Sequence, residues 1–255
     1  MQAKKTKSDI SDKELLRYNR HIVLPEIDIN GQLALSSAKL VIVGLGGLGC
    51  PVATYLAASG IGTLYLVDHD SISLSNLNRQ VLFTEKDISK KKVVAAKERL
   101  LELNSEINIK TFDKEINRKS DIKLFKDCNA IIDCTDNFET RALINDISIK
   151  LKIPLITGAA LKFEGQIAIF RNDINNMPCY RCLYPDLPNI ANSCVDSGIL
   201  GSVTGFVGTA LAAESIKLIC SFGEIYQSKL FLMDLKNNDF KKIDINKDEK
   251  CKYCK

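Results

Sequence analysis

A glycine-rich loop directly follows a short apolar segment, and this pairing constrains the fold more than any other feature of the chain. The apolar segment is residues 40–43, and the loop carries Gly44, Gly46, Gly47 and Gly49. Glycines in this pattern allow a tight turn between a strand and a helix, and let the backbone approach phosphate groups closely. The pattern predicts a nucleotide site at the carboxyl end of the first strand, but by itself it does not choose between NAD and ATP.

Short apolar or β-branched segments alternate with helical patterns over the first 158 residues. Near-continuous apolar runs of this length are typical of buried parallel strands. They predict strands at residues 39–43, 63–67, 107–112, 130–134 and 155–157. Apolar spacing predicts helices at 50–59, 93–103 and 138–151, and a capping box from Ser11 to Glu14 predicts a short helix that ends near His21. This alternation predicts an α/β fold, a Rossmann-like doubly wound and mostly parallel sheet with right-handed crossovers.

The second half of the chain has a different character. It begins with a predicted strand at 165–170 and ends with a zinc-stapled extension if the cysteines described below bind metal. Between them, residues 172–201 are rich in Asn, Pro, Asp and Gly, and a helix is predicted at about 203–220. We therefore expect a long crossover loop, which in a compact domain is usually functional or held by a ligand.

The chain length of 255 residues is enough for one sizeable hydrophobic core. We expect a disordered arm over residues 1–10 and a single domain over 11–255. Within that domain, we expect residues 11–158 to form the nucleotide-binding half, and residues 159–255 to form a second half with the crossover loop and the zinc site.

Composition excludes several classes of function. The 35 basic and 31 acidic residues leave a dispersed net charge of +4, too small to indicate a nucleic-acid-binding protein. The start of the chain lacks the apolar core of a signal peptide. The most apolar long segment, residues 202–220, contains Glu214 and Lys217, which favours a buried helix over a membrane span. We expect a cytoplasmic protein without a membrane or nucleic-acid partner.

Two aspartates follow predicted strands at the edge of the sheet where the glycine loop begins. Asp68 follows the second strand and is placed to accept hydrogen bonds from ribose hydroxyls, or alternatively to cap the next turn. Asp136 follows the fourth strand, where a carboxylate would repel phosphate unless a cation lay between them. Mg²⁺ suits that position because it binds one or two carboxylates together with phosphate oxygens. The alternative for Asp136 is the N-cap of the helix that begins near Phe138.

Additional polar and basic residues favour ATP over NAD. The segment between the second and third strands contains Ser75, Asn76, Arg79 and Lys92. Transfer of an adenylyl group develops charge on the α-phosphate and on the departing pyrophosphate, so several cations and a metal ion would stabilise it. An NAD-dependent oxidoreductase would explain the glycine loop and Asp68 but would leave the remaining residues without a role. A nucleotide-binding module without turnover is a third possibility.

Nine cysteines are present, and four of them have the spacing of metal ligands. Cys179 and Cys182 form one Cys-x-x-Cys pair, and Cys251 and Cys254 form another. Two such pairs supply a closed tetrahedral zinc site, whereas a single pair could also be a redox centre. We interpret the four thiols as a structural zinc site that joins the C-terminal segment to the crossover loop.

The remaining cysteines are of two kinds. Cys194 lies in the polar loop and is a candidate nucleophile, although no neighbouring histidine is present in the sequence to lower its pKa. The others lie in apolar or helical contexts and are expected in the core: Cys50, Cys128, Cys134 and Cys220.

Five short motifs together resemble the ubiquitin-activating-enzyme-like sulfur-carrier adenylyltransferases. They are Arg-Tyr-Asn-Arg at 17–20, the glycine loop at 44–49, Ser-Asn-Leu-Asn-Arg at 75–79, Asp-Cys-Thr-Asp-Asn at 133–137 and Cys-Tyr-Arg-Cys at 179–182. The resemblance extends from about Ser11 to Cys254. It is strongest to the molybdopterin-synthase branch of the family, and the thiamine-pathway branch is next.

This resemblance implies a reaction between ATP and a small ubiquitin-like sulfur-carrier protein with a C-terminal Gly-Gly. The carrier's terminal carboxylate would become an acyl-adenylate with release of pyrophosphate, for molybdopterin cofactor biosynthesis or, alternatively, for thiamine biosynthesis. The resemblance assigns Gly47 and Asp68 to the nucleotide, and Asp136 to magnesium. It also assigns contacts with the phosphates and the rest of the nucleotide to Ser75, Asn76, Arg79, Lys92 and Asn137.

The resemblance also implies an assembly. Members of the family form homodimers in which an arginine matching Arg20 reaches the partner's ATP site. Some relatives carry a cysteine proposed to bond covalently with the carrier or sulfur in the loop that contains Cys194. Some relatives continue into a sulfurtransferase domain, whereas this sequence stops just after Cys254, so we expect a separate sulfur donor protein.

Overall fold

A single mixed β-sheet forms the centre of the computed structural model, which describes residues 9–116, 122–185 and 198–254. The strand order across the sheet is β3-β2-β1-β4-β5-β6-β7-β8. The strands are β1 (Lys39–Val43), β2 (Thr63–Val67), β3 (Asn108–Phe112), β4 (Ala130–Asp133), β5 (Leu155–Leu161), β6 (Glu164–Phe170), β7 (Lys229–Asp234) and β8 (Asp239–Asp244).

The parallel and antiparallel parts of the sheet occupy opposite sides. From β3 through β5 every neighbouring pair is parallel, with Val41 of β1 opposite Tyr65 of β2 and Ile131 of β4. From β5 through β8 every neighbouring pair is antiparallel. The predicted α/β fold is confirmed, and the sheet is mixed, with four parallel and three antiparallel strand pairs among the described residues.

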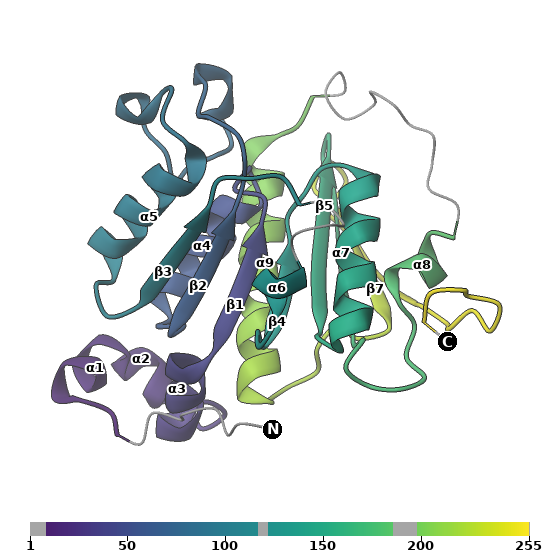
Figure 1. The fold of residues 1–255 in the computed structure, drawn as a ribbon, viewed down its shortest axis with the longest axis horizontal. Coiled ribbons are helices and arrows are strands. Elements are labelled where there is room, and N and C mark those ends of the chain that lie inside the picture. Colours follow the sequence, from purple (N-terminus) through teal and green to yellow (C-terminus); the bar gives the residue numbers. More distant parts are fainter. Residues whose placement is uncertain (1–8, 117–121, 186–197, 255) are drawn as a thin grey trace.

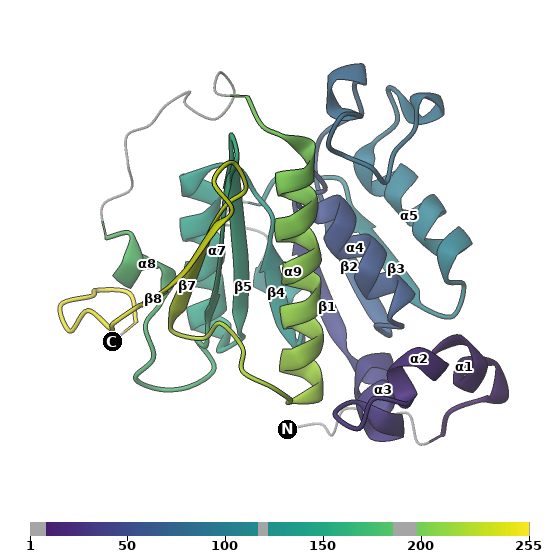
Figure 2. The same cartoon turned by 180° about the vertical axis from the view of Figure 1, so that it is seen from behind.

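Helices cover both faces of this sheet. Figure 1 shows α7 and α6 in front of it, and Figure 2 shows α4 and α9 in front of the opposite face. The helices are α1 (Asp12–Arg17), α2 (Asn19–Ile22), α3 (Asp28–Ser37), α4 (Gly49–Ala58), α5 (Lys92–Leu103), α6 (Ile122–Phe125), α7 (Phe138–Leu151), α8 (Tyr180–Leu183) and α9 (Gly201–Cys220). Two short 3₁₀ helices, η1 (Leu74–Asn76) and η2 (Glu85–Asp87), lie between β2 and α5.

Two hydrophobic cores lie on the two faces. The first is formed by α4, α5 and α9 against the sheet and contains the fully buried Leu56, Leu100 and Val207. The second lies under α7 and contains Ile144 and Phe170. Because both faces of the central strands β1 and β4 are covered, these strands are largely apolar, as the sequence pattern predicted, whereas the edge strand β3 has exposed polar residues.

The apolar helix α9 is an interior helix of this fold. Its length and composition would also permit a membrane span. It packs along α4 and β5, however, and Val203, Val207 and Leu211 are fully buried. Glu214, also buried, pairs with Lys217 at 2.6 Å and accepts the Tyr226 amide, so its charge is satisfied within the protein. This is the buried helix that the sequence predicted.

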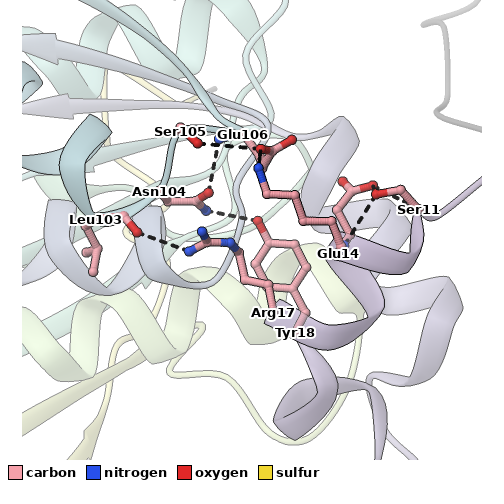
Figure 3. Close-up of polar contacts among 9 residues, drawn as sticks. Ser11, Glu14, Arg17, Tyr18, Leu103, Asn104, Ser105 and Glu106 are labelled. Atoms are coloured by element: carbon pink, nitrogen blue, oxygen red, sulfur yellow. Dashed lines mark hydrogen bonds and ion pairs between the residues drawn. The ribbon is translucent and has the colours of Figure 1, made fainter.

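The N-terminal helices pack against the end of α5 through polar contacts (Figure 3). The capping box predicted from Ser11 to Glu14 is present, although the helix breaks at Tyr18 into α1 and α2. The Tyr18 hydroxyl accepts a hydrogen bond from Asn104 at 2.9 Å, and Arg17 donates to the Leu103 carbonyl at 3.1 Å. These contacts fix the segment that carries Arg20.

Several elements were not predicted from the sequence. The helix α3 contains Gly31 in its interior, which lowers its intrinsic helical propensity. The strand β8 is exposed along its whole length, so it lacks the apolar alternation that identifies a strand, and it exists because it pairs with β7. The predicted crossover loop contains the short helix α8, while its residues 186–197, like most of the expected arm over 1–10, lie outside the described residues.

Candidate functional site

A cavity of about 890 Å³ opens at the carboxyl ends of β1, β2 and β4. This volume lies in the range of small-molecule binding sites. Most of the predicted nucleotide residues line it: Gly44, Gly46, Gly47, Asp68, Arg79, Lys92, Asp136 and Asn137. Gly49, Ser75 and Asn76 are not among the lining residues. The parallel sheet thus brings together side chains that are up to 93 positions apart in the chain, as expected for its carboxyl edge.

The glycine loop is packed so closely that larger residues would not fit at several of its positions. Gly44 has a φ of +89°, and a Cβ there would lie 2.8 Å from the Cys134 carbonyl oxygen. A Cβ on Gly49 would lie 1.9 Å from the Gly44 carbonyl oxygen, and one on Gly47 would meet the Thr204 hydroxyl at 2.8 Å. These glycines therefore let the loop pack between β4 and α9. Gly46, which lines the cavity, is less crowded, since a Cβ there would lie 3.9 Å from Gln80 Nε2.

Asp68 connects the glycine loop to the following turn. One carboxylate oxygen accepts the Leu45 amide at 2.6 Å, and the other accepts the Asp70 amide at 2.8 Å. The turn-capping role considered as an alternative is therefore present. The carboxylate also lines the cavity, and each oxygen retains a lone pair, so these bonds are compatible with a ribose contact.

Lys92 is a buried cation of the cavity. Its side chain is 5% exposed, and its ammonium lies 2.6 Å from Asp70 Oδ2. Burial acts to raise the pKa of Asp70, but the hydrogen bond and charge of Lys92 outweigh it and lower that pKa below its usual value. Sequence reasoning missed Asp70, since an acid two residues after Asp68 has no distinctive pattern.

Arg79 bonds to neutral acceptors beside the cavity. Its guanidinium donates to the Ser75 carbonyl at 3.0 Å and to the Asn78 side-chain oxygen at 3.1 Å. Asn76 Oδ1 accepts the Ser73 amide at 3.2 Å, which stabilises η1. In this structure Ser75 and Asn76 therefore shape the turn that presents Arg79, while Asn78 and Arg79 face the cavity.

The turn that carries Asp136 is held from two sides. The buried Asp133 carboxylate accepts the Thr135 amide at 3.0 Å and the Thr157 hydroxyl at 3.1 Å. Burial raises the pKa of Asp133, and the charge of Arg141 partly opposes this shift. Arg141 donates two hydrogen bonds to the Thr135 carbonyl, at 2.5 and 3.1 Å.

Two further observations concern this turn. Asn137 is the N-cap of α7, because its side chain accepts the Thr140 amide at 2.8 Å, so the N-cap role considered for Asp136 belongs to its neighbour. Arg141 was not predicted as a site residue, yet it is nearly buried and lines the cavity. Its position one helical turn after the N-cap is the signal that could have identified it.

Arg20 is not part of this cavity. It lies in α2, among the N-terminal helices, which Figure 1 shows at the end of the sheet opposite the glycine loop. The position is compatible with the predicted contact to a partner subunit, since Arg20 does not line the cavity of its own chain.

Four cysteines converge at the C-terminus. The sulfur of Cys179 lies 3.9 Å from that of Cys182 and 3.8 Å from that of Cys251, and the sulfurs of Cys182 and Cys254 are 3.5 Å apart. All four sulfurs lie within 4.8 Å of one another. Four sulfurs bound tetrahedrally to zinc at about 2.3 Å would be about 3.8 Å apart, so this arrangement fits the ion.

The protonation of these thiols depends on a cation. Burial raises the pKa of Cys179 above its usual value and that of Cys254 to about 11. Metal binding requires thiolates, so only a nearby dication would offset the cost of burying their charge. Burial also acts to raise the pKa of Cys251, but hydrogen bonds from the Tyr253 and Cys254 amides lower it below its usual value.

The other cysteines have different surroundings. Burial raises the pKa of Cys50 to about 12 and that of Cys220 to about 11, so both are poor nucleophiles. The expectation of core positions is confirmed for Cys50, Cys128 and Cys134, whereas Cys220 is half-buried. The candidate nucleophile Cys194 lies outside the described residues.

Comparison with known proteins identifies the family. The model of the ThiF family matches residues 18–253. The chain belongs to the ThiF family. This confirms the resemblance inferred from the five sequence motifs.

Curated relatives of this ThiF-family chain include two fly proteins. It is 38% identical over 250 residues to the adenylyltransferase and sulfurtransferase MOCS3 of Drosophila ananassae, covering 97% of this chain and 55% of the relative. It is 39% identical over 248 residues to MOCS3-1 of Drosophila pseudoobscura pseudoobscura, covering 96% and 54%. The chain thus spans about half the length of the curated relatives it matches.

Solved structures of E. coli MccB are similar along most of the chain. The ThiF-family fold superimposes on MccB with ATP at a TM-score of 0.83 and 25% identity, covering 99% of this chain and 76% of MccB. The complex of MccB with AMPCPP and MccA gives a TM-score of 0.80 and 27% identity, covering 88% and 69%. MccB therefore provides an ATP-bound structure of the same fold.

Proposed function

We propose that this protein uses ATP to adenylate the C-terminal glycine carboxylate of a small ubiquitin-like sulfur-carrier protein, for molybdopterin cofactor biosynthesis. The observation that carries this proposal is the convergence of the glycine loop with Arg79, Lys92 and Asp136 on one cavity. Membership of the ThiF family and similarity to the MOCS3 adenylyltransferases support it. An NAD-dependent oxidoreductase is not favoured, because it would leave these three charged residues without a function.

The proposed reaction breaks the bond between the α-phosphorus of ATP and the oxygen that bridges to the β-phosphate. The carrier's carboxylate oxygen bonds to the α-phosphorus, and pyrophosphate leaves. Because the carboxylate is already ionised, no general base is needed, and positioning and charge stabilisation provide the catalysis. We assign Lys92 and Arg79 to the phosphate oxygens and Asp68 to the ribose.

We also propose that Asp136 holds Mg²⁺. A bound magnesium ion would screen phosphate charge from the carboxylates at this edge of the sheet. Asp136 fits this role because it lines the cavity, while the neighbouring Asn137 satisfies the helix N-terminus. Arg141 positions Asp136 through its two hydrogen bonds to the preceding carbonyl.

The cysteine cluster is proposed to bind one structural zinc ion. The sulfur–sulfur separations of 3.5, 3.8 and 3.9 Å support a tetrahedral site. Zinc would join residues 251–254 to the start of the crossover loop, leaving no open coordination position for catalysis. Metal analysis should find about one zinc per chain.

The proposed assembly is a cytoplasmic homodimer in which residues 11–255 act as one domain and Arg20 reaches the partner's ATP site. Its position outside the cavity of its own chain supports this role. An Arg20→Ala variant mixed with an Asp136→Ala variant tests it. Partial recovery of activity in the mixture is expected if the two residues act across subunits. No recovery would contradict the proposed contact of Arg20 with the partner's ATP site.

We also keep Cys194 as the candidate thiol for later sulfur transfer.

Carrier-dependent exchange of pyrophosphate into ATP tests the function. The assay contains the protein, magnesium and the molybdopterin-pathway carrier with an intact C-terminal Gly-Gly. Label exchange that disappears when the terminal glycine is deleted is the expected result. Faster exchange with the thiamine-pathway carrier would reassign the pathway, and no exchange with either carrier would refute carrier adenylation.

A further inference from the structure

The ion pair between Lys92 and Asp70 is strongly asymmetric. The Lys92 side chain is 5% exposed and the Asp70 side chain is 51% exposed, and the two charged groups are 2.6 Å apart. Both residues line the cavity. The ammonium has lost nearly all of its hydration and needs an anionic partner, whereas the carboxylate could return to water at little cost.

The backbone fixes the two residues side by side. The Lys92 amide donates to the Asp70 carbonyl at 3.1 Å, and Ser71 forms an antiparallel bridge with Lys91. The Ile72 amide also donates to the Lys90 carbonyl at 2.9 Å. The pairing therefore results from the folded backbone and does not depend on one flexible surface contact.

The location of Lys92 increases its need for an anion. It is the first residue of α5, at the positive end of the helix dipole. A cation at that position is destabilised, while an anion beside it is favoured. Asp70 supplies this negative charge in the structure, and a phosphate group would supply more of it.

We propose that Asp70 is an exchangeable counter-ion of Lys92. Asp70 pairs with Lys92 in the nucleotide-free protein, and a phosphate oxygen takes the place of the Asp70 carboxylate when ATP binds. This inference rests on the proposed role of Lys92 in phosphate binding. Asp70 thus keeps the buried ammonium paired at every stage, and it makes binding at this position depend on a ligand that carries negative charge. Because Asp70 competes with phosphate, it lowers the affinity for ATP.

Three other cavity cations show how Lys92 differs. Arg79 and Arg141 bond to neutral carbonyl or amide oxygens, so no carboxylate has to leave before they bind phosphate. Lys241 pairs with Asp239, but there both side chains are well exposed to solvent. Among these cations, Lys92 is the one whose charge is buried and neutralised by an exposed carboxylate.

The test measures nucleotide affinity of the full chain by calorimetry, with no carrier present. We expect Asp70→Asn to lower the Kd for ATP about tenfold, because a charge that repels phosphate and occupies Lys92 is removed. The Kd for adenosine, which lacks phosphate, should stay within about twofold. Both measurements are made with magnesium and again with EDTA.

The neighbouring ion pair offers a matched control. Asp113 pairs with Lys91 at 3.2 Å, and both side chains are 44% exposed. Asp113→Asn removes the same charge, but Asp113 does not line the cavity, so the Kd for ATP should change less than about twofold. In a Lys92→Met background, the gain from Asp70→Asn should shrink, since the two residues act on each other.

Other outcomes would overturn the proposal. An unchanged or raised Kd for ATP in Asp70→Asn would mean that Asp70 holds Lys92 in position and does not compete with phosphate. Weaker binding only in the presence of magnesium would make Asp70 a metal ligand. Failure of the proposed function is distinguishable, because tighter ATP binding without carrier-dependent exchange would refute adenylation and leave the role of Asp70 intact.

Discussion

The two ends of the sheet build their candidate sites in different ways. At the parallel end, the backbone forms most of the site: Gly44 adopts a positive φ, and the Leu45 amide bonds to Asp68. At the antiparallel end, four side-chain sulfurs from two distant segments approach within 4.8 Å of one another. The first site is organised by close packing before any ligand binds, whereas the second is a cluster of side-chain sulfurs with the spacing of metal ligands.

This difference separates catalysis from stability. Ligand binding at the parallel end should change activity while the strands and helices remain intact, because the covered sheet supports the loop. Ligand loss at the antiparallel end should change stability, because residues 251–254 are joined to α8 through the thiols. The following predictions test this separation, beginning with the largest expected effect.

Asp136→Ala should have the largest effect and should affect activity alone. Loss of a group that holds the metal against the reacting phosphates is expected to reduce carrier-dependent exchange by about 10³-fold or more. The melting temperature should stay within about 2 °C of that of the wild type, because the Asp133 and Asn137 side chains still stabilise the turn. Exchange at the wild-type rate would remove Asp136 from the metal site.

Cys182→Ser should have its main effect on stability. Losing one of four ligands should release the metal and lower the free energy of unfolding by about 4 kcal/mol, or roughly 8–16 °C in melting temperature. Zinc content and thermal unfolding measure this effect. ATP affinity measured below the transition should change by less than about threefold. A larger loss of ATP affinity would show that the two sites are coupled and would contradict the separation of catalysis from stability.

Gly44→Ala should destabilise the parallel end through the backbone. The added methyl group would lie 2.8 Å from the Cys134 carbonyl oxygen, at a residue with φ of +89°. The strain and the clash together should lower the free energy of unfolding by about 3 kcal/mol and weaken ATP binding.

Gly205→Ala is the matched control for this substitution. Gly205 lies within α9, and an added Cβ meets nothing within 4 Å. This substitution should raise the free energy of unfolding by about 0.5–1 kcal/mol in chemical denaturation, because alanine has the higher helix propensity. Equal effects of the two substitutions would show that packing at Gly44 is unimportant.

Acid should weaken the parallel end through Asp87. Burial acts to raise its pKa, but hydrogen bonds from Thr84 and Lys90 lower it to about 2. Because the folded pKa lies below the unfolded value of about 3.9, this stabilisation is complete above that pH and is lost as the pH falls toward about 2. With Lys90 44% exposed, we expect only about 1–2 kcal/mol.

Asp87→Asn measures this contribution. The variant should be less stable than the wild type at pH 7, and the difference should disappear near pH 2, as followed by denaturant unfolding across that range. A constant difference at all pH values would assign the effect to lost packing and not to the charge of Asp87.

Local patterns explain why much of the parallel end could be predicted from the sequence. Apolar runs specify the strands β1, β2 and β4, and the order of elements along the chain specifies a shared carboxyl edge, so Asp68 and Asp136 could be placed together. The cysteine cluster was also predictable, because few structures other than metal sites need two Cys-x-x-Cys pairs. These inferences depend on spacing, which the sequence contains directly.

Other features depend on contacts between distant segments. The strand β8 forms because it pairs with β7, and its own residues carry little strand signal. Arg141 of α7 faces the same cavity as Lys92 of α5 because the sheet brings the ends of these two helices together. Helical or extended propensity alone does not contain this information.

By itself, the sequence determined a strand, a glycine loop and a helix, together with four thiols that can bind a metal. Only the tertiary structure decided which charged groups from separate segments neutralise one another: Asp70 with Lys92 at the cavity, and Asp113 with Lys91 beside it. The physical reason is that backbone conformation follows from neighbouring residues, whereas the electrostatic partner of a buried charge depends on which segments the folded chain brings within a few ångströms.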